Sequence, residues 1–197
     1  MNNQLEKNCH QIVRGFMNED RASSLYKDFM KFNHLYRLAG DSQVPRSSAL
    51  YNYLPAIEVL THSTQKISEI VKESLLPAYS YSRIYKNKAE LKRHIDRNSC
   101  EVSVTLHLGG DMPWDIWIQP PKQEARPVSL QPGDAMIYLG VKAPHWRKPY
   151  EGNHYAQFFL HYVRTYGNLA DYFFDTGADY KMTISMIKKF NSGAWKQ

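Results

Sequence analysis

The chain has 197 residues, of which 43% are hydrophobic and 22% charged, and its formal net charge is +6. These values are typical of a soluble globular protein, and the length suits one sizeable domain. No run of eighteen apolar residues occurs, which excludes a transmembrane helix, and the N-terminal segment lacks the charged-then-apolar layout of a signal peptide.

Cysteine usage and charge distribution narrow the function classes further. The two cysteines, Cys9 and Cys100, have no metal-ligand spacing, and so low a count suits a reducing compartment, so we expect a cytoplasmic protein. The lysines and arginines are scattered, and no zinc-finger or RNP-type motif accompanies them. We expect no membrane or nucleic-acid partner; the positive charge indicates a mildly basic surface or an anionic substrate.

The N-terminal part, residues 1–77, is predicted to be helical. Apolar residues recur at helical spacing over residues 4–33, where 18–20 can interrupt them, and again over 51–76. The stretch 39–48 between them is rich in turn formers and reads as a loop. Pro77 is predicted to mark the end of the second helix.

From residue 78 onwards the chain changes to short strands and turns. Residues 100–108 alternate apolar and polar side chains, the pattern of a strand with two different faces. The other predicted strands are 78–85, 114–118, 127–130, 135–139 and 155–163.

Helices followed by many short strands predict a mainly β protein, a β-sandwich or jelly roll braced by N-terminal helices. We therefore expect a single domain over 1–197, with helical support in 1–77, the jelly-roll core in 78–163 and a C-terminal tail in 164–197. Within the tail, residues 181–190 are predicted to form a short helix.

The segment His94-Ile95-Asp96 carries the main candidate chemistry. In an extended strand the histidine and the carboxylate point the same way. A second histidine would complete the 2-His-1-carboxylate triad that holds Fe(II) and leaves coordination positions open. Because the dipeptide spacing is common by chance, the interpretation depends on a downstream ligand. His145, His154 and His161 are the candidates, and His145 follows a predicted strand and turn.

The order of these motifs resembles the Fe(II)/2-oxoglutarate-dependent dioxygenase superfamily, on the prolyl-4-hydroxylase-like branch, and within it an uncharacterised subgroup. The resemblance covers about residues 78–163. It rests on several pieces in register: the strand ending at Tyr85, His94-Ile95-Asp96, the alternating strand 101–108, the turn and strand entry 130–135, His145 and the closing strand to Val163.

This resemblance implies a double-stranded β-helix, the cupin-like jelly roll, in which His94, Asp96 and His145 are the catalytic metal ligands for Fe(II). It implies 2-oxoglutarate and O2 as co-substrates, succinate and CO2 as products, and hydroxylation of a C–H bond. Related halogenases lack the carboxylate ligand, so Asp96 favours hydroxylation. The substrate stays open: a prolyl or other protein residue and a small molecule both fit.

One position departs from the family pattern. An arginine or lysine about nine or ten residues after the second histidine usually binds the far carboxylate of 2-oxoglutarate, because a buried carboxylate needs a charge-assisted partner. Here those positions hold His154 and Tyr155. His154 and Arg147 rank equally as replacements, followed by Arg83.

Three further residues are expected in the co-substrate site: Tyr85, Thr105 and His107. Tyr85 equally fits a packing role, and Thr105 equally fits a cross-strand pair. Because the usual basic residue is missing, two alternatives stay open: a non-catalytic cupin-like binding module, and an iron oxygenase that does not use 2-oxoglutarate.

Overall fold

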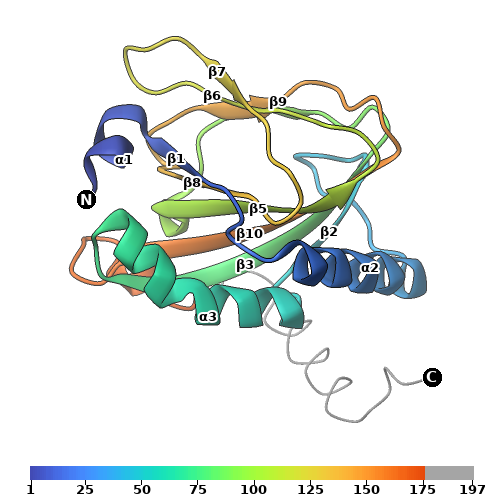
Figure 1. The fold of residues 1–197 in the computed structure, drawn as a ribbon, viewed down its shortest axis with the longest axis horizontal. Helices are drawn as coiled ribbons and strands as arrows, with labels where there is room; N and C mark the ends of the chain where they lie inside the picture. Colours follow the sequence, from blue (N-terminus) through green and yellow to red (C-terminus); the bar gives the residue numbers. More distant parts are fainter. Residues whose placement is uncertain (176–197) are drawn as a thin grey trace.

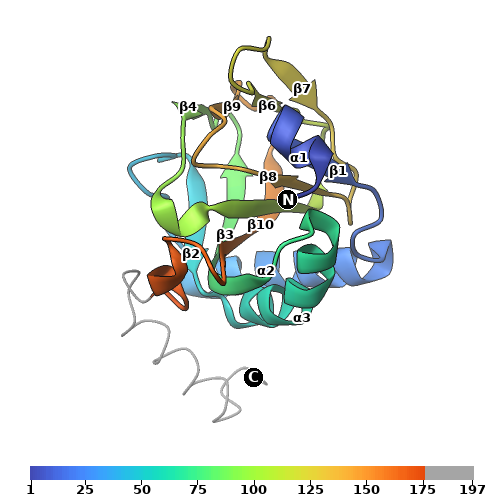
Figure 2. The same ribbon diagram turned by 90° about the vertical axis from the view of Figure 1, so that its left-hand side faces the viewer.

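The computed structural model describes residues 1–175, and within them two antiparallel sheets face each other (Figures 1 and 2). The larger sheet has the order β1-β8-β5-β10-β3-β2, and the smaller has the order β4-β9-β6-β7. The larger sheet contains β1 (His10–Val13), β2 (Ser47–Tyr51), β3 (Leu75–Lys86), β5 (Val102–Gly110), β8 (Ala135–Tyr138) and β10 (His154–Arg164). The smaller contains β4 (Leu91–His94), β6 (Ile116–Ile118), β7 (Arg126–Val128) and β9 (His145–Arg147). The predicted double-stranded β-helix is confirmed.

Two long helices cover the outer face of the larger sheet, as Figures 1 and 2 show: α2 (Glu19–Tyr36) and α3 (Leu54–Val71). A short helix, α1 (Asn3–Asn8), precedes them, and two 3₁₀ turns, Asn98–Cys100 and Ala170–Tyr172, lie in later loops. The side chain of Asn18 caps α2 by accepting hydrogen bonds from the first backbone N–H groups. No helix within residues 1–175 is long and apolar enough to cross a membrane.

Strand alternation divides β10 into an outer and an inner face. Phe158 packs edge-on against Phe29 of α2, with ring centroids 5.9 Å apart, and the Tyr162 hydroxyl donates to a carbonyl of α3. Phe159 and His161, which alternate with these outward residues, therefore point inwards to the space between the two sheets, where both line a cavity. A ligand bound in this inner space can contact residues of both sheets.

The N-terminal third differs from its prediction in three places. The helix expected over 4–33 is interrupted by β1, because Cys9 has a left-handed backbone that ends α1 and the chain then pairs with β8. The end of the predicted loop 39–48 is β2. Pro77 lies inside β3 instead of ending a helix. It is tolerated because β2 pairs only with residues 81–85, which leaves Pro77 where β3 is an edge.

The predicted C-terminal strands agree with β3, β5, β6, β7, β8 and β10 to within a few residues at each end. The short strands β4 and β9, which lie beside the candidate triad, were not predicted. The helix expected over 181–190 lies outside the described residues.

Candidate functional site

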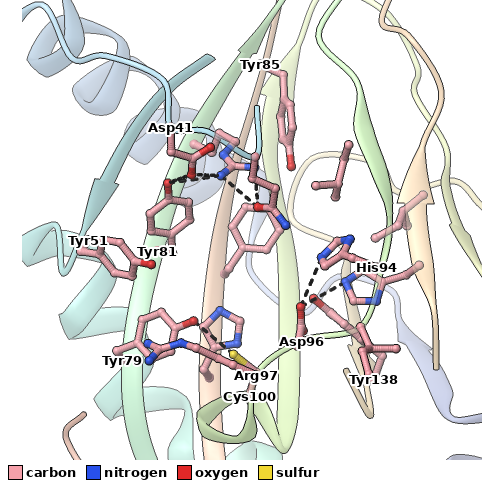
Figure 3. A pocket seen from close by; sticks show the side chains of 18 residues that line it. Asp41, Tyr51, Tyr79, Tyr81, Tyr85, His94, Asp96, Arg97, Cys100 and Tyr138 are labelled. Carbon is pink, nitrogen blue, oxygen red and sulfur yellow. Dashed lines mark hydrogen bonds and ion pairs between the residues drawn. The ribbon is translucent and has the colours of Figure 1, made fainter. Parts of the chain in front are cut away.

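Three of the predicted site residues meet between the two sheets. His94 ends β4 and His145 begins β9, and the two residues are direct partners in the antiparallel pairing of these strands. Asp96 follows β4 by two residues. Its Oδ1 lies 3.4 Å from Nε2 of each histidine. Dashed lines at Asp96 mark these contacts in Figure 3.

Each histidine is oriented by a backbone carbonyl. Nδ1 of His94 lies 2.9 Å from the carbonyl oxygen of Lys92, and Nδ1 of His145 lies 3.1 Å from that of Ala143. A carbonyl oxygen only accepts hydrogen bonds, so Nδ1 carries the proton and donates it. In the neutral imidazole the lone pair is then on Nε2, facing Asp96, which is the arrangement found in metal-ligating histidines.

Asp96 is held in place by its surroundings. Its backbone N–H donates to the carbonyl of Gly140 at 2.9 Å, and the Ser103 hydroxyl donates to Oδ2 at 3.2 Å. Burial raises the pKa of Asp96, but its contacts with His145 and His94 lower that pKa by more, so the pKa of this carboxyl lies well below the usual range. Ligand atoms of the two histidines and this carboxylate lie within 4.8 Å of one another, a donor set that suits Fe(II).

A second group of potential ligands shares Asp96. Cys100 and His161 also place ligand atoms within 4.8 Å of each other and of the carboxylate. Burial raises the pKa of Cys100 to about 12, and a protonated thiol is a poor ligand. The Cys100 thiol also contacts the Tyr79 hydroxyl at 3.1 Å, while Nδ1 of His161 contacts Ser103 at 2.9 Å. The first group is therefore the better candidate for a metal site.

A cavity of about 240 Å³ opens beside the three residues. Aromatic side chains from β2, β3 and β10 form much of its wall, among them Tyr51, Tyr79 and Tyr81 (Figure 3). Arg83 of β3 also lines it. Two apolar side chains, Leu91 and Ile116, close it on the side of the smaller sheet.

Solved structures share this architecture, although no family model and no curated protein matches the sequence. A Pseudomonas putida prolyl-4-hydroxylase superimposes with a TM-score of 0.66 and 15% identity, over 82% of this chain and 95% of that one. A Trichoplax adhaerens prolyl hydroxylase, solved with a hypoxia inducible factor peptide fragment, gives 0.64 and 13%, over 81% and 86%. HygX from Streptomyces hygroscopicus, solved with nickel, 2-oxoglutarate and hygromycin B, gives 0.62 and 14%, over 82% and 85%. The fold is that of the Fe(II)/2-oxoglutarate oxygenases.

Of the three further residues expected in the co-substrate site, one lines the cavity and two do not. Tyr85 lines the cavity, and its buried hydroxyl has no hydrogen-bond partner. Thr105 and His107 point into the same interior but lie behind the cavity wall. The Thr105 hydroxyl accepts a hydrogen bond from Gln157 at 2.8 Å, and His107 stacks on Tyr155 with ring centroids 4.1 Å apart.

Arg147 lies beside this stack and is 1% exposed. Its guanidinium sits 4.7 Å from the ring centroid of Trp114 and 5.0 Å from that of Tyr155, and Nη1 donates to the Trp114 carbonyl at 2.6 Å. Nε, Nη2 and the Tyr155 hydroxyl have no partner. Among residues 1–175 no carboxylate pairs with Arg147. A buried cation with two free N–H groups fits a carboxylate ligand, because an uncompensated charge is costly to bury.

His154 does not reach the cavity. It stacks on Tyr26 of α2, with ring centroids 5.9 Å apart, and so lies on the helical side of the larger sheet. Strand alternation accounts for this: Tyr155 points inwards and its neighbour His154 points outwards. The expectation that His154 binds the co-substrate is therefore wrong. Arg147 does not line the cavity either, but its guanidinium lies against the inward-facing Tyr155, so it is the better of the two candidates.

Sequence reasoning ranked Arg83 low and missed Asp41 as a site residue. Asp41 comes from the loop after α2 and forms an ion pair with Arg83. The alternation in residues 78–85 could have predicted one wall of the cavity. One face of this strand carries four residues that line it: Tyr79, Tyr81, Arg83 and Tyr85.

The buried His107 predicts how stability changes in acid. Burial, aided by the charge of Arg147, lowers its pKa from 6.5 to about 4. Between these values the unfolded chain binds a proton that the folded protein does not, so the free energy of unfolding falls as the pH drops from about 6.5 to about 4. We expect this one group to account for about 3 kcal/mol of that loss.

Denaturant unfolding at pH 7 and pH 4.5 measures this contribution. The loss of stability on acidification should be smaller in His107→Gln than in the wild type. An identical loss in both proteins would contradict the prediction.

Proposed function

We propose that this protein is a non-haem Fe(II)- and 2-oxoglutarate-dependent oxygenase that hydroxylates a C–H bond of its substrate. The observation that carries the proposal is the meeting of His94, Asp96 and His145, with both Nε2 atoms turned to one ionised carboxylate beside a cavity. The likeness to HygX, which was solved with nickel and 2-oxoglutarate, supports the same ligand pair here.

The three residues would hold Fe(II) and leave coordination positions free for the 2-oxo acid and for O2. Fe(II) bound there would supply O2-dependent oxidation of a substrate C–H bond, coupled to conversion of 2-oxoglutarate to succinate and CO2. The carbonyl oxygens of Lys92 and Ala143 keep the imidazoles in the ligating tautomer. Asp96 occupies a position that would otherwise be open to an anion, which favours hydroxylation over halogenation.

The far carboxylate of 2-oxoglutarate would be bound by the free N–H groups of Arg147 and by the hydroxyls of Tyr85 and Tyr155. Trp114 links these groups, because Tyr85 packs edge-on against it at 4.9 Å and Arg147 stacks over it. Low polarity around the guanidinium strengthens its interaction with a carboxylate. The positive charge that binds this carboxylate would then come from β9. The family pattern instead places it nine or ten residues after the second histidine, which here is the start of β10.

The direct test is turnover. We expect the purified protein to consume O2 and to form succinate only when Fe(II) and 2-oxoglutarate are both present. O2 consumption is followed with an electrode and succinate by mass spectrometry. Iron-bound protein that forms no succinate above an iron-only control would sink the assignment.

A second candidate, an iron oxygenase that does not use 2-oxoglutarate, is favoured by the aromatic stack of His107, Tyr155 and Trp114, which fills the interior around Arg147. For this candidate, O2 consumption in the presence of substrate would be the same with and without 2-oxoglutarate. The same measurement therefore separates the two functions.

The position of Gly140 gives a prediction on metal affinity. A Cβ atom at this residue would lie 2.1 Å from Oδ2 of Asp96, so alanine must push the carboxylate away. We expect Gly140→Ala to weaken Fe(II) or Ni(II) binding by roughly 10- to 100-fold, the range for disturbed support of a metal ligand. Calorimetric titration with Ni(II) measures it, and circular dichroism checks the fold. Unchanged affinity in a folded variant would show that Asp96 is not a ligand.

A further inference from the structure

A buried ion pair lies in the wall of the cavity, apart from the three proposed metal ligands. Arg83 of β3 is 2% exposed, and its Nη2 forms an ion pair with Oδ2 of Asp41. Asp41 and Tyr81 lie next to each other in Figure 3. The same guanidinium reaches the Tyr81 hydroxyl at 3.2 Å and the Gln43 side-chain oxygen at 3.3 Å. Its Nε has no partner. Arg83 therefore keeps one buried N–H that needs an acceptor.

The anionic partner is more open to solvent. The side chain of Asp41 is 36% exposed, and its Oδ1 accepts the backbone N–H of Val44 at 2.8 Å. Its pKa is raised by burial but lowered more by Tyr81 and Arg83, so the carboxylate is ionised. The pair thus presents a cation deep in the wall and an anion towards the mouth.

Aromatic rings surround the anionic end. Tyr51 and Tyr81 both line the cavity and meet at 59°, with ring centroids 4.5 Å apart. Ring faces of tyrosine attract an ammonium group, and a carboxylate beside them adds to that attraction. The combination favours a cationic group near Asp41 and an anionic group near Arg83.

We propose that Arg83, Asp41 and Tyr81 are the substrate-binding site of this oxygenase, and that it takes a free amino acid. The substrate carboxylate binds Nε of Arg83, and the substrate ammonium binds Asp41 against the tyrosine rings. This inference rests on the proposed function, since it supplies the substrate of the same site.

The site disfavours other substrates by charge and by size. A ligand with only an anionic group is repelled by Asp41, and one with only a cationic group is repelled by Arg83. A residue inside a peptide has neither a free ammonium nor a free carboxylate on its backbone. The cavity of about 240 Å³ also lies below the range of about 300–1,000 Å³ typical of sites that enclose drug-sized ligands.

The test is calorimetric titration of the Ni(II)-loaded protein, saturated with 2-oxoglutarate, with each common protein amino acid. Ni(II) prevents turnover, so binding is read without activity. We expect at least one amino acid to bind, and both its N-acetyl and its carboxamide derivative to bind at least about tenfold more weakly, which is about 1.4 kcal/mol.

Variants decide which residues are responsible. Arg83→Gln and Asp41→Asn should each weaken the bound amino acid about tenfold or more, while the affinity for 2-oxoglutarate stays unchanged. Asp41→Asn alters a partly exposed group, so it serves if Arg83→Gln fails to fold. Arg46→Gln, which removes a cation of the same loop that does not line the cavity, is the matched control.

Three results would overturn the proposal. One is that no amino acid binds; another is that the capped derivatives bind as well as the free amino acid. In the third, Arg83→Gln loses affinity for 2-oxoglutarate, which would make Arg83 the co-substrate anchor and leave the oxygenase function standing. Loss of Ni(II) and 2-oxoglutarate binding in the wild type would instead contradict the proposed function itself.

Discussion

Replacing Asp96 with alanine is expected to abolish turnover and to weaken Fe(II) binding by more than about 100-fold, beyond the effect of disturbing a supporting residue. The carboxylate lies 3.4 Å from both imidazole Nε2 atoms and is the only anionic member of the donor set. Its removal leaves two neutral imidazoles, which cannot balance the charge of a divalent ion. Anaerobic calorimetry with Fe(II) and a succinate assay measure the two effects.

The control for Asp96→Ala is Glu124→Ala, which removes an exposed carboxylate of the β6–β7 turn and the same unit of charge. It should bind Fe(II) and form succinate as the wild type does. If Asp96→Ala bound Fe(II) with wild-type affinity, the carboxylate would not be a ligand.

Replacing Arg147 with glutamine is expected to weaken 2-oxoglutarate binding by roughly 10- to 100-fold, since a hydrogen bond to a charged group contributes about 1.5–3 kcal/mol. Arg147 is the buried cation whose Nε and Nη2 lack partners, so its loss removes the charge and leaves the metal ligands in place. Calorimetry of 2-oxoglutarate with Ni(II)-loaded protein measures the effect, and Ni(II) affinity should not change.

Two variants serve as controls for Arg147→Gln. His154→Gln changes a residue on the helical side of the sheet and should bind 2-oxoglutarate as the wild type does. Arg126→Gln removes an exposed guanidinium from the smaller sheet. Equal affinities in wild type and Arg147→Gln would rule out Arg147 as the anchor.

The sequence was sufficient to predict the fold class, and the three residues that it proposes as metal ligands lie together in the structure. The alternation in residues 100–108 corresponds to β5, and the turn over residues 130–135 leads into β8, both in the larger sheet. The period of two is visible although both faces of β5 are buried, because its inner face carries Ser103, Thr105 and His107. Predicting that His94 and Asp96 point the same way required only the local geometry of an extended strand. Choosing His145 as the third ligand required the order and spacing of several motifs, because its contact with His94 is set by the pairing of β4 with β9.

The surroundings of the triad were less predictable because they depend on tertiary contacts. β4 and β9 are too short to show a period of their own. The choice between His154 and Arg147 turned on which residue of β10 faces inwards, and a shift of one residue reverses it. Asp41 stands in a loop without periodicity, and only the fold brings it to Arg83.

The most direct test of the central claim is a crystal structure with Ni(II) and 2-oxoglutarate, with the metal located by its anomalous scattering. The account predicts one ion bound by Nε2 of His94, Nε2 of His145 and the carboxylate of Asp96. It also predicts the far carboxylate of 2-oxoglutarate on Arg147. An ion bound instead by Asp96, Cys100 and His161, or by none of these residues, would contradict it.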